Sequence, residues 1–345
     1  MDLRTAFDTV NHSCLLQKLP YYGIRGIEVD WISSYLFHRS QAVHFDGVLS
    51  NKEFVTHGVP QGSILGPLLF VFLINDLPTQ LKFCNVLMYA DDTVIYFTHK
   101  SPKEIEHFVN EDANAVFKWM SENCLILNPK KGKTEFILFA SKKREIPVKI
   151  VIDENVINQP ETYEYLGIKL DSHLNMSSHF QVMFNRISSR IKMLRKVRHK
   201  ISPLVATTIF KSMIEPLFFY CYPTFGQISN TWLYKFESLF TRAKVIVKFH
   251  QQSWPTFRNG MKERIVTNVF KALNNDPPNG KYELINYGIA TRGNNNKIRL
   301  PNVRSEAGRK LSYFQGALTF NQLDTELRKE KNFNLFKKNL KDFDF

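Results

Sequence analysis

The chain has only four cysteines, and no two of them form a Cys-x-x-Cys pair. They lie far apart in the sequence, at Cys14, Cys84, Cys124 and Cys221. Such spacing argues against a disulfide framework and against a structural zinc site, because both usually need closely spaced cysteines. We therefore expect a reducing, intracellular setting, in the nucleus, the cytoplasm or both, rather than secretion.

Long apolar runs are also absent. The longest, residues 64–74, is interrupted by Gly66 and Pro67 and is too short to span a bilayer, which takes about 20 apolar residues. No targeting segment is visible, so we expect no membrane partner. The 345 residues are 43% hydrophobic, which is enough for a sizeable core and two or three subdomains.

Acidic residues are missing from residues 172–214, although the whole chain has 32 of them. The net charge of +14 is correspondingly uneven, with 7 Lys/Arg against 9 Asp/Glu in residues 1–100 and 39 against 23 in the remainder. A basic run is often only a solvated helix face, but the complete lack of acid favours a phosphate backbone as partner. The candidate nucleic-acid-binding residues are Arg186, Arg190, Arg195, Lys196 and Arg198.

Helical and strand-like patterns alternate up to about residue 173. Apolar spacing predicts a helix pair over 15–36, a helix over 68–77 that is apolar on all faces, and a helix that begins with the capping box Ser101-Pro102-Lys103-Glu104. Alternation predicts a hairpin over 41–55 that turns at Asp46-Gly47, and strands over 134–139, 148–153 and 163–170. The predicted fold is α+β, with an antiparallel sheet and helices on one of its faces.

The remainder of the chain is predicted to be helical. Helices are expected over 180–201, from Ser202-Pro203 to about Tyr220, and over 231–247. In the first of these helices, apolar residues recur at helical spacing and would face the core, with the basic residues on the other side. These apolar residues are Phe180, Phe184, Ile187, Ile191 and Leu194.

Two adjacent carboxylates, Asp91 and Asp92, lie between the β-prone runs 85–88 and 93–97. This arrangement predicts that they occupy the tip of a tight hairpin. Neighbouring carboxylates resist joint ionisation, so a site that holds both in charged form usually contains a hard cation such as Mg²⁺. A solvated turn is the simpler interpretation of these residues alone. A second acidic cluster at 2–8 and a Gly/Pro loop at 58–67 precede them and favour a functional site.

In their order, spacing and wording, these motifs resemble the reverse transcriptases of non-LTR retrotransposons of the LINE class, and among them the jockey-like elements. The resemblance extends to Thr291-Arg292-Gly293, to Phe320-Asn321-Gln322-Leu323 and to Phe336-Lys337-Lys338. It implies an RNA-directed DNA polymerase that adds deoxynucleoside triphosphates to a DNA primer on an RNA template. It also implies a palm over 1–173, a basic, thumb-like helical region over 174–260 and a tail over 261–345 for which the pattern predicts no particular fold.

The resemblance assigns Asp2, Asp91 and Asp92 as catalytic residues and metal ligands, with the main-chain carbonyl of Leu3 as a further ligand. The metal would be two Mg²⁺ ions, with Mn²⁺ as the alternative, stabilising the attacking and the leaving oxygen together. The neighbouring Asp8 does not match the family's ligand. We expect it to cap the following helix or to bind a nearby Arg or Lys.

Substrate contacts are implied for four other residues. Phe7 resembles the steric gate that meets the sugar of the incoming nucleotide, and its alternative is an aromatic residue of the core. Gln61 and Gly62 would lie against nucleotide or template. Lys133 resembles a lysine near the leaving phosphates, with a solvated lysine as its alternative. Leu166-Gly167 resembles the primer grip, with a plain edge strand as its alternative.

In the family, a fingers subdomain and a strand precede the position of Asp2. We therefore expect fingers to be absent from this chain, Asp2 to be loosely held, and the chain alone to be weakly active or inactive. The alternative function is a catalytically inactive, truncated remnant that at most binds nucleic acid.

Overall fold

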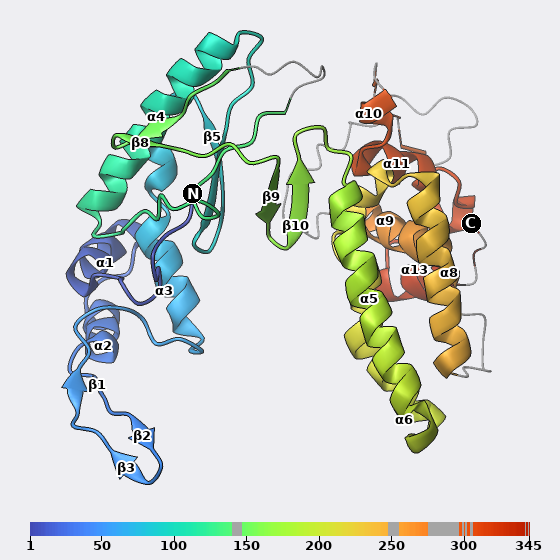
Figure 1. Cartoon of the computed structure of the whole chain (residues 1–345), viewed down its shortest axis with the longest axis horizontal. Coiled ribbons are helices and arrows are strands. Elements are labelled where there is room, and N and C mark those ends of the chain that lie inside the picture. Colours follow the sequence, from blue (N-terminus) through green and yellow to red (C-terminus); the bar gives the residue numbers. More distant parts are fainter. Residues whose placement is uncertain are drawn as a thin grey trace. The chain divides into compact units, whose positions relative to one another are not determined.

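The computed structural model describes residues 1–139, 147–247, 255–274, 297–298, 300, 302–303, 306–341, 343 and 345. The chain forms two compact units, Met1–Tyr163 and Glu164–Phe345. Both contain helices, and the strands pair into small two-stranded antiparallel sheets (Figure 1). The α+β class is thus confirmed in its coarse form, whereas the division into palm, thumb and tail stays a prediction.

Unit 1 begins with the predicted helix pair. The helices are α1 (His12–Lys18), the short 3₁₀ helix η1 (Leu19–Tyr22) and α2 (Ile27–Leu36). Gly23 ends η1 with a left-handed φ of 83°, which glycine adopts without steric cost. The next segment folds back on itself as β1 (Ser40–Gln41), β2 (His44–Phe45), β3 (Val48–Leu49) and β4 (Glu53–Phe54). Its turn lies at Asp46-Gly47 as predicted.

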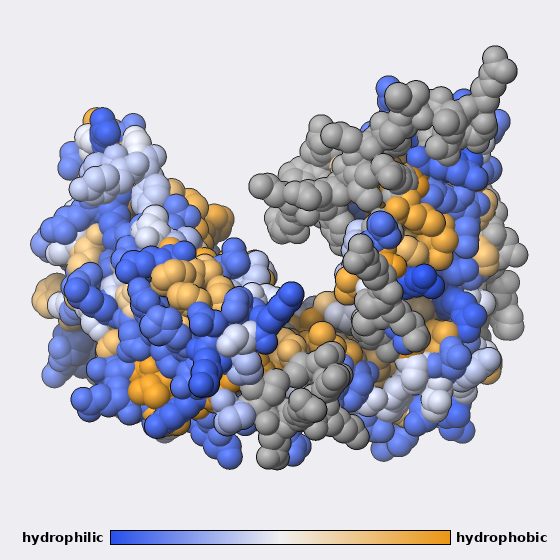
Figure 2. Space-filling model, turned by 90° about the horizontal axis from the view of Figure 1, so that it is seen from above, coloured by the Kyte–Doolittle hydropathy of each residue, from blue (hydrophilic) through white to orange (hydrophobic). Residues whose placement is uncertain are grey.

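The apolar helix α3 (Leu65–Ile74) packs one face into the core of unit 1 and is followed by η2 (Leu77–Gln80). Leu69, Phe70 and Leu73 are buried there. The helix is apolar on all faces, but only one face is buried, because Leu68 and Val71 are 49% and 43% exposed. Apolar side chains are also exposed on the face of unit 1 shown in Figure 2, where orange patches lie among hydrophilic residues.

The long helix α4 (Pro102–Glu122) supports the hairpin of β5 (Asn85–Tyr89) and β6 (Asp92–Tyr96). Its Asp112 is 1% exposed and accepts hydrogen bonds from the main-chain N–H groups of Lys82, Phe83 and Cys84, at 3.0, 2.9 and 2.6 Å. These residues lead directly into β5. The predicted helix is confirmed, but the Ser101 side chain forms no capping hydrogen bond.

The later strands are shorter than predicted. They are β7 (Val151–Ile152), β8 (Asn155–Val156), β9 (Thr162–Tyr165) and β10 (Ile168–Asp171). The strand predicted over 134–139 is wrong, since only Glu135 forms an isolated bridge, to Asn158. Alternating apolar and polar residues give a segment two different faces, but they do not provide the partner strand with which it must pair. Residues 163–170 form a hairpin because Leu166 and Gly167 both adopt positive φ, at 47° and 74°.

Unit 2 is helical. It contains α5 (Ser177–Val197), α6 (Pro203–Ile209), a π-helical segment (Phe210–Ile214), α7 (Glu215–Phe219), α8 (Asn230–Val247) and α9 (Phe257–Leu273), with the 3₁₀ segments Arg198–Lys200 and Tyr222–Gln227 between them. The Ser202 side chain caps α6 as predicted, accepting from the N–H of Val205. The core is rich in phenylalanine, and Phe218 contacts Phe236, Phe240 and Phe257.

The tail, for which the sequence predicted no fold, is also helical. It adds α10 (Glu306–Arg309), α11 (Ser312–Phe320), α12 (Thr325–Lys329) and α13 (Phe333–Leu340). Helices α11, α12 and α13 enclose a core with α9 in which Phe270 and Phe336 stack at 4.1 Å between ring centroids. In the motif 320–323, the Asn321 amide exchanges two hydrogen bonds with the main chain of Ile298, both at 2.7 Å. The motif 291–293 lies outside the described residues.

Candidate active site

The paired carboxylates lie at a hairpin tip, as predicted. Tyr89 pairs with Asp92, so Ala90 and Asp91 form a two-residue loop and Asp92 is the first residue of β6. Ala90 has a φ of 51°, a conformation in which glycine is usual. The backbone is therefore locally strained at Ala90, in the turn that presents the two carboxylates.

The segment that carries Asp2 is held on two sides by main-chain pairing. On one side, Met1 and Thr93 exchange hydrogen bonds, at 2.7 and 3.4 Å. On the other side, Arg4 donates to the carbonyl of Ile126 and Asn128 donates to the carbonyl of Asp2, both at 2.9 Å. The Asp2 N–H also donates to the Thr134 hydroxyl at 3.1 Å. The sequence had predicted a loosely held Asp2, and these contacts instead fix its main chain.

This pairing also decides where the carbonyl of Leu3 points. Successive residues of an extended segment direct their main-chain groups to opposite sides. The main-chain groups of Asp2 and Arg4 form hydrogen bonds with residues 126–128, and those of Met1 form hydrogen bonds with β6. The main-chain groups of Leu3 consequently point away from residues 126–128.

The carboxylate of Asp2 has two neighbours, which both approach its Oδ2 atom. The Asn128 amide donates to it at 3.3 Å, and Lys133 Nζ lies 3.8 Å away. The side chain of Lys133 is 54% exposed, so solvent weakens this ion pair. Asn128 and Thr134 were not assigned from the sequence, although both belong to the segment around Lys133.

The carboxylates influence one another electrostatically. Burial raises the pKa of Asp92, and the charges of Asp91 and Asp2 raise it further, whereas Lys133 opposes the shift. All of the candidate donors are oxygens, which suits a hard cation such as Mg²⁺. Within the described residues, however, no three His, Cys, Asp or Glu side chains are close enough to enclose a metal ion together. The oxygens thus fit the cation by their chemistry and do not form a closed cage.

A cavity of about 600 Å³ opens beside Asp2 and Asp91. It brings together most of the residues predicted for metal and substrate, and Gly62 and Asp92 are not part of its wall. Three further polar residues of the wall, Arg4, Asn128 and Lys130, were given no role from the sequence, although Arg4 lies in the acidic cluster 2–8 and the other two lie in the segment around Lys133. The full wall consists of Asp2, Leu3, Arg4, Thr5, Ala6, Phe7, Asp8, Gln61, Asp91, Asn128, Lys130 and Lys133.

The Gly/Pro loop packs directly on the segment that follows Asp2. A Cβ atom at Gly58 would lie 2.8 Å from the main-chain oxygen of Asp8, so only glycine allows this approach. Gln61 Nε2 donates to the Asp8 carboxylate at 2.8 Å. The expected role of Asp8 as a helix cap or a partner of Arg or Lys is therefore wrong, because Asn11 caps α1 and Asp8 accepts from an amide. Gly62 has a φ of 77° and open space around it.

Phe7 has properties of both proposed roles. It borders the cavity, as a residue that meets the nucleotide sugar would. Its ring also lies 4.8 Å from the ring of buried Phe70, and it packs against the core of unit 1. One face of the side chain is thus supported by the core while the residue lines the cavity.

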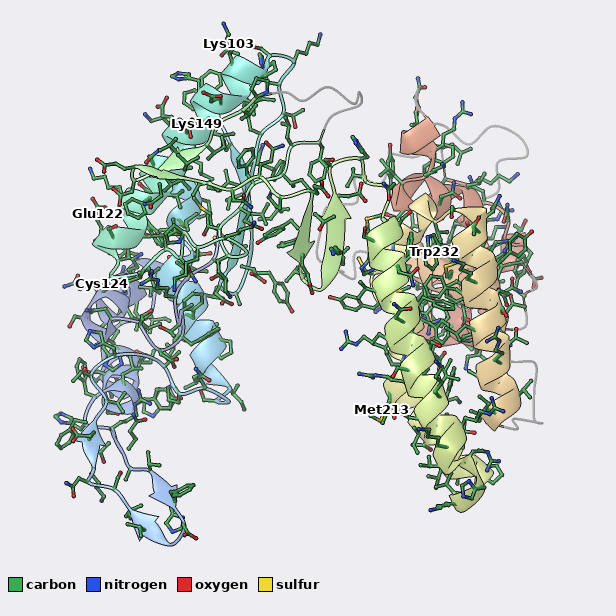
Figure 3. The ribbon with its side chains drawn as sticks, viewed as in Figure 1. Lys103, Glu122, Cys124, Lys149, Met213 and Trp232 are labelled. Atoms are coloured by element: carbon green, nitrogen blue, oxygen red, sulfur yellow. The ribbon has the colours of Figure 1, made fainter. Side chains whose placement is uncertain are left out.

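The predicted basic face belongs to α5 in unit 2. The apolar residues predicted to face the core are buried there, except Phe184, which is half-buried. Arg186, Arg195 and Lys196 are exposed. The other two basic residues bind main-chain carbonyls, Arg190 that of Met213 (labelled in Figure 3) at 2.6 Å and Arg198 those of Ile246 and Ile201 at 2.9 Å. Three of the five candidates are consequently available to phosphate.

Leu166 and Gly167, which resemble the primer grip, occupy the turn between β9 and β10 rather than an edge strand. The Tyr220 hydroxyl donates to the carbonyl of Leu166, and the Tyr220 ring lies 3.6 Å from the position of a Cβ atom on Gly167. The turn therefore rests on an aromatic side chain of unit 2.

Comparison with known proteins gives a consistent assignment. Residues 1–170 match the family described as reverse transcriptase (RNA-dependent DNA polymerase). The RNA-directed DNA polymerase from mobile element jockey of Drosophila melanogaster is 29% identical over 264 residues, which cover 74% of this chain and 28% of the relative. The corresponding protein of Drosophila funebris is 30% identical with the same coverage.

A third relative is the probable RNA-directed DNA polymerase from transposon X-element of Drosophila melanogaster, 28% identical over 69% of this chain and 27% of its own length. The chain thus spans little more than a quarter of the length of these relatives. Among the described residues, no helix is long and apolar enough to cross a membrane. Residues 1–170 therefore belong to the reverse transcriptase family.

Proposed function

We propose that the protein is an RNA-directed DNA polymerase of a non-LTR retrotransposon, with Asp2, Asp91 and Asp92 as its catalytic carboxylates. The observation that carries this proposal is that Asp2 and Asp91, 89 positions apart, line one cavity. Main-chain pairing of Met1 with Thr93 brings them together, and the pKa of Asp92 responds to both.

The proposed cofactor is a pair of Mg²⁺ ions, with Mn²⁺ as a possible substitute. When bound, they would stabilise the charge that develops on the attacking primer oxygen and on the leaving pyrophosphate. Asp2, Asp91, Asp92 and the carbonyl of Leu3 would hold them. Lys133 Nζ lies 3.8 Å from Asp2 Oδ2, so a cation bound to that oxygen would repel the lysine and displace it from Asp2.

The rest of the cavity wall suits a deoxynucleoside triphosphate. Arg4 and Lys130 have no side-chain hydrogen bond or ion pair within the described part of the chain, and both line the cavity. Together with Lys133, after it leaves Asp2, they would place positive charge around the phosphates. Phe7 would lie against the sugar, supported from behind by Phe70.

Template and primer would bind through the phosphate backbone. We propose that α5 in unit 2 contributes Arg186, Arg195 and Lys196, which are exposed on one helix without any acidic neighbour on it. Residues 174–260, which contain this helix, would then be the thumb-like region, and residues 1–173 the palm.

Primer extension tests the proposal. The purified chain is given an RNA template, a labelled DNA primer, deoxynucleotides and Mg²⁺, beside an Asp91→Asn/Asp92→Asn variant. The matched control is Asp46→Asn, which alters a carboxylate at another hairpin tip in the same unit, away from the cavity wall. Extension by the wild type and by Asp46→Asn, abolished in the double variant, supports the assignment.

The second candidate is a protein that binds nucleic acid without catalysis. It is favoured by the contacts of Asn128 and Lys133 with Asp2, which both involve the Oδ2 atom of this carboxylate. Binding of primer-template by gel shift, without extension in either Mg²⁺ or Mn²⁺, would support this candidate and refute the polymerase.

A further inference from the structure

Two cysteines that lie far apart in the sequence meet on unit 1. Cys14 is in the first turn of α1, and Cys124 follows the last turn of α4 in a left-handed conformation, with a φ of 58°. Burial raises the pKa of the Cys14 thiol, and the charge and side-chain hydrogen bond of Cys124 raise it further, so the two thiols are neighbours. Figure 3 shows Cys124, which is labelled, beside the helix that carries Cys14.

Solvent reaches this pair. Cys124 is exposed and Cys14 is half-buried, and both are free thiols. Cys84 differs, because it is buried against Asp112 and Phe108, with its pKa raised to about 12 by burial and by Asp112. Exposure and thiolate character together decide which cysteine an oxidant reaches first, so Cys84 is protected and Cys124 is not.

We propose that Cys14 and Cys124 form an oxidisable dithiol, a modification site that closes to an intramolecular disulfide in the presence of hydrogen peroxide. In the first step, the Cys124 sulfur attacks peroxide, takes one oxygen as sulfenic acid and releases water. In the second step, the Cys14 sulfur attacks the Cys124 sulfur, and a second water leaves with the hydroxyl group and the thiol proton. Each disulfide consumes one peroxide, and the two thiols supply the two electrons.

The position of the pair connects it to the candidate active site. Residues 125–128 follow Cys124 directly, and their main chain pairs with Leu3 and its neighbours. Cys14 lies on α1, the helix that follows the Asp2 segment. A disulfide would therefore add a covalent link beside the non-covalent pairing that holds Asp2. It would also close a loop of roughly 110 residues, which restricts the unfolded chain and raises thermal stability.

The test is peptide mapping of the full chain after oxidation. The reduced protein is treated with hydrogen peroxide, remaining thiols are blocked with iodoacetamide, and the protein is digested without reductant. We expect an intact mass lower by two hydrogen atoms before blocking, a peptide pair that joins Cys14 to Cys124, a higher thermal midpoint, and reversal of all three by dithiothreitol.

Variants make the assignment specific. Cys14→Ser and Cys124→Ser should each abolish the cross-link and the rise in thermal midpoint, whereas Cys221→Ser, in the other unit, should retain both. Oxygen added to Cys124 without a cross-link, or a disulfide to another cysteine, would overturn the proposal. The mapping of the wild type decides this even if a variant does not fold, and it does not depend on polymerase activity.

Discussion

Replacing Asp112 tests how the structure supports the hairpin that presents Asp91 and Asp92. This buried carboxylate accepts three main-chain N–H groups, those of Lys82, Phe83 and Cys84. Alanine would leave all three donors without an acceptor. Each donor that water does not reach would lower the free energy of unfolding by about 1–3 kcal/mol. Because water can enter part of the space, we expect Asp112→Ala to lower the free energy of unfolding by about 3–5 kcal/mol.

Glu111→Ala is the matched control. Glu111 is adjacent to Asp112 on α4 and binds the side chain of the same Lys82 at 3.2 Å. That ion pair is exposed, at 70% for Lys82 and 39% for Glu111, so its loss should cost at most about 0.5 kcal/mol. Equal effects of the two variants would refute the argument from burial.

The assay combines urea unfolding with hydrogen exchange. Urea midpoints give the overall loss of stability. Hydrogen exchange of the amides at 82–84 reports local opening at the start of β5, even if the two units unfold separately. In Asp112→Ala, these amides should exchange faster than in Glu111→Ala. Unchanged protection of the three amides in Asp112→Ala would show that the carboxylate does not hold the start of β5.

The pH dependence of Asp112 gives an independent check. Burial by itself would raise its pKa, but hydrogen bonds from Cys84, Lys82 and Phe83 outweigh burial and lower it. A carboxylate with a lowered pKa stabilises the fold above its unfolded pKa, about 4, and loses this contribution as the pH falls through the folded value. The stability gap between wild type and Asp112→Asn should therefore be constant from neutral pH to about pH 4 and shrink below it.

Three further predictions concern the candidate site. Gly58→Ala should cost about 1–3 kcal/mol more than Gly62→Ala in urea unfolding, because both have positive φ and only the first meets backbone within 3 Å. Asn128→Ala should lower the primer-extension rate by about 10-fold, since its amide orients Asp2; an unchanged rate would refute this role. Asp92→Asn should raise the thermal midpoint of the metal-free protein at neutral pH, because the pKa of Asp92 is raised and its charged form therefore destabilises the fold. This gain should disappear below about pH 4, where Asp92 is protonated in the folded and the unfolded protein. An equal gain at all pH values would exclude a charge effect.

Local features were predictable from the sequence where the interactions are local. The turns at Asp46-Gly47 and at Ala90-Asp91 lie where the pattern placed them, because hairpin turns depend on a few consecutive residues. The apolar stripe of α5 was likewise predictable from its helical spacing, and it is buried except at the half-buried Phe184. The helix break at Gly23 also follows from its own backbone freedom.

Predictions that required a distant partner were less successful. Residues 134–139 have a strand-like pattern and yet form only one bridge, to Asn158. Leu68 and Val71 have the composition of core residues and are exposed. Composition shows that a side chain can be buried, whereas tertiary packing decides which of several apolar faces is covered.

The sequence by itself determined the family motifs, the hairpin that presents Asp91 and Asp92, and the basic helix that lacks acidic residues. Only the tertiary structure decided that Asp2 lies beside that hairpin, that Asn128 bonds to the Asp2 carboxylate, and that Cys14 meets Cys124. The physical reason is the range of the interactions. Turns and helix faces depend on neighbours within a few residues, whereas these contacts join residues about a hundred positions apart and exist only once the core has closed.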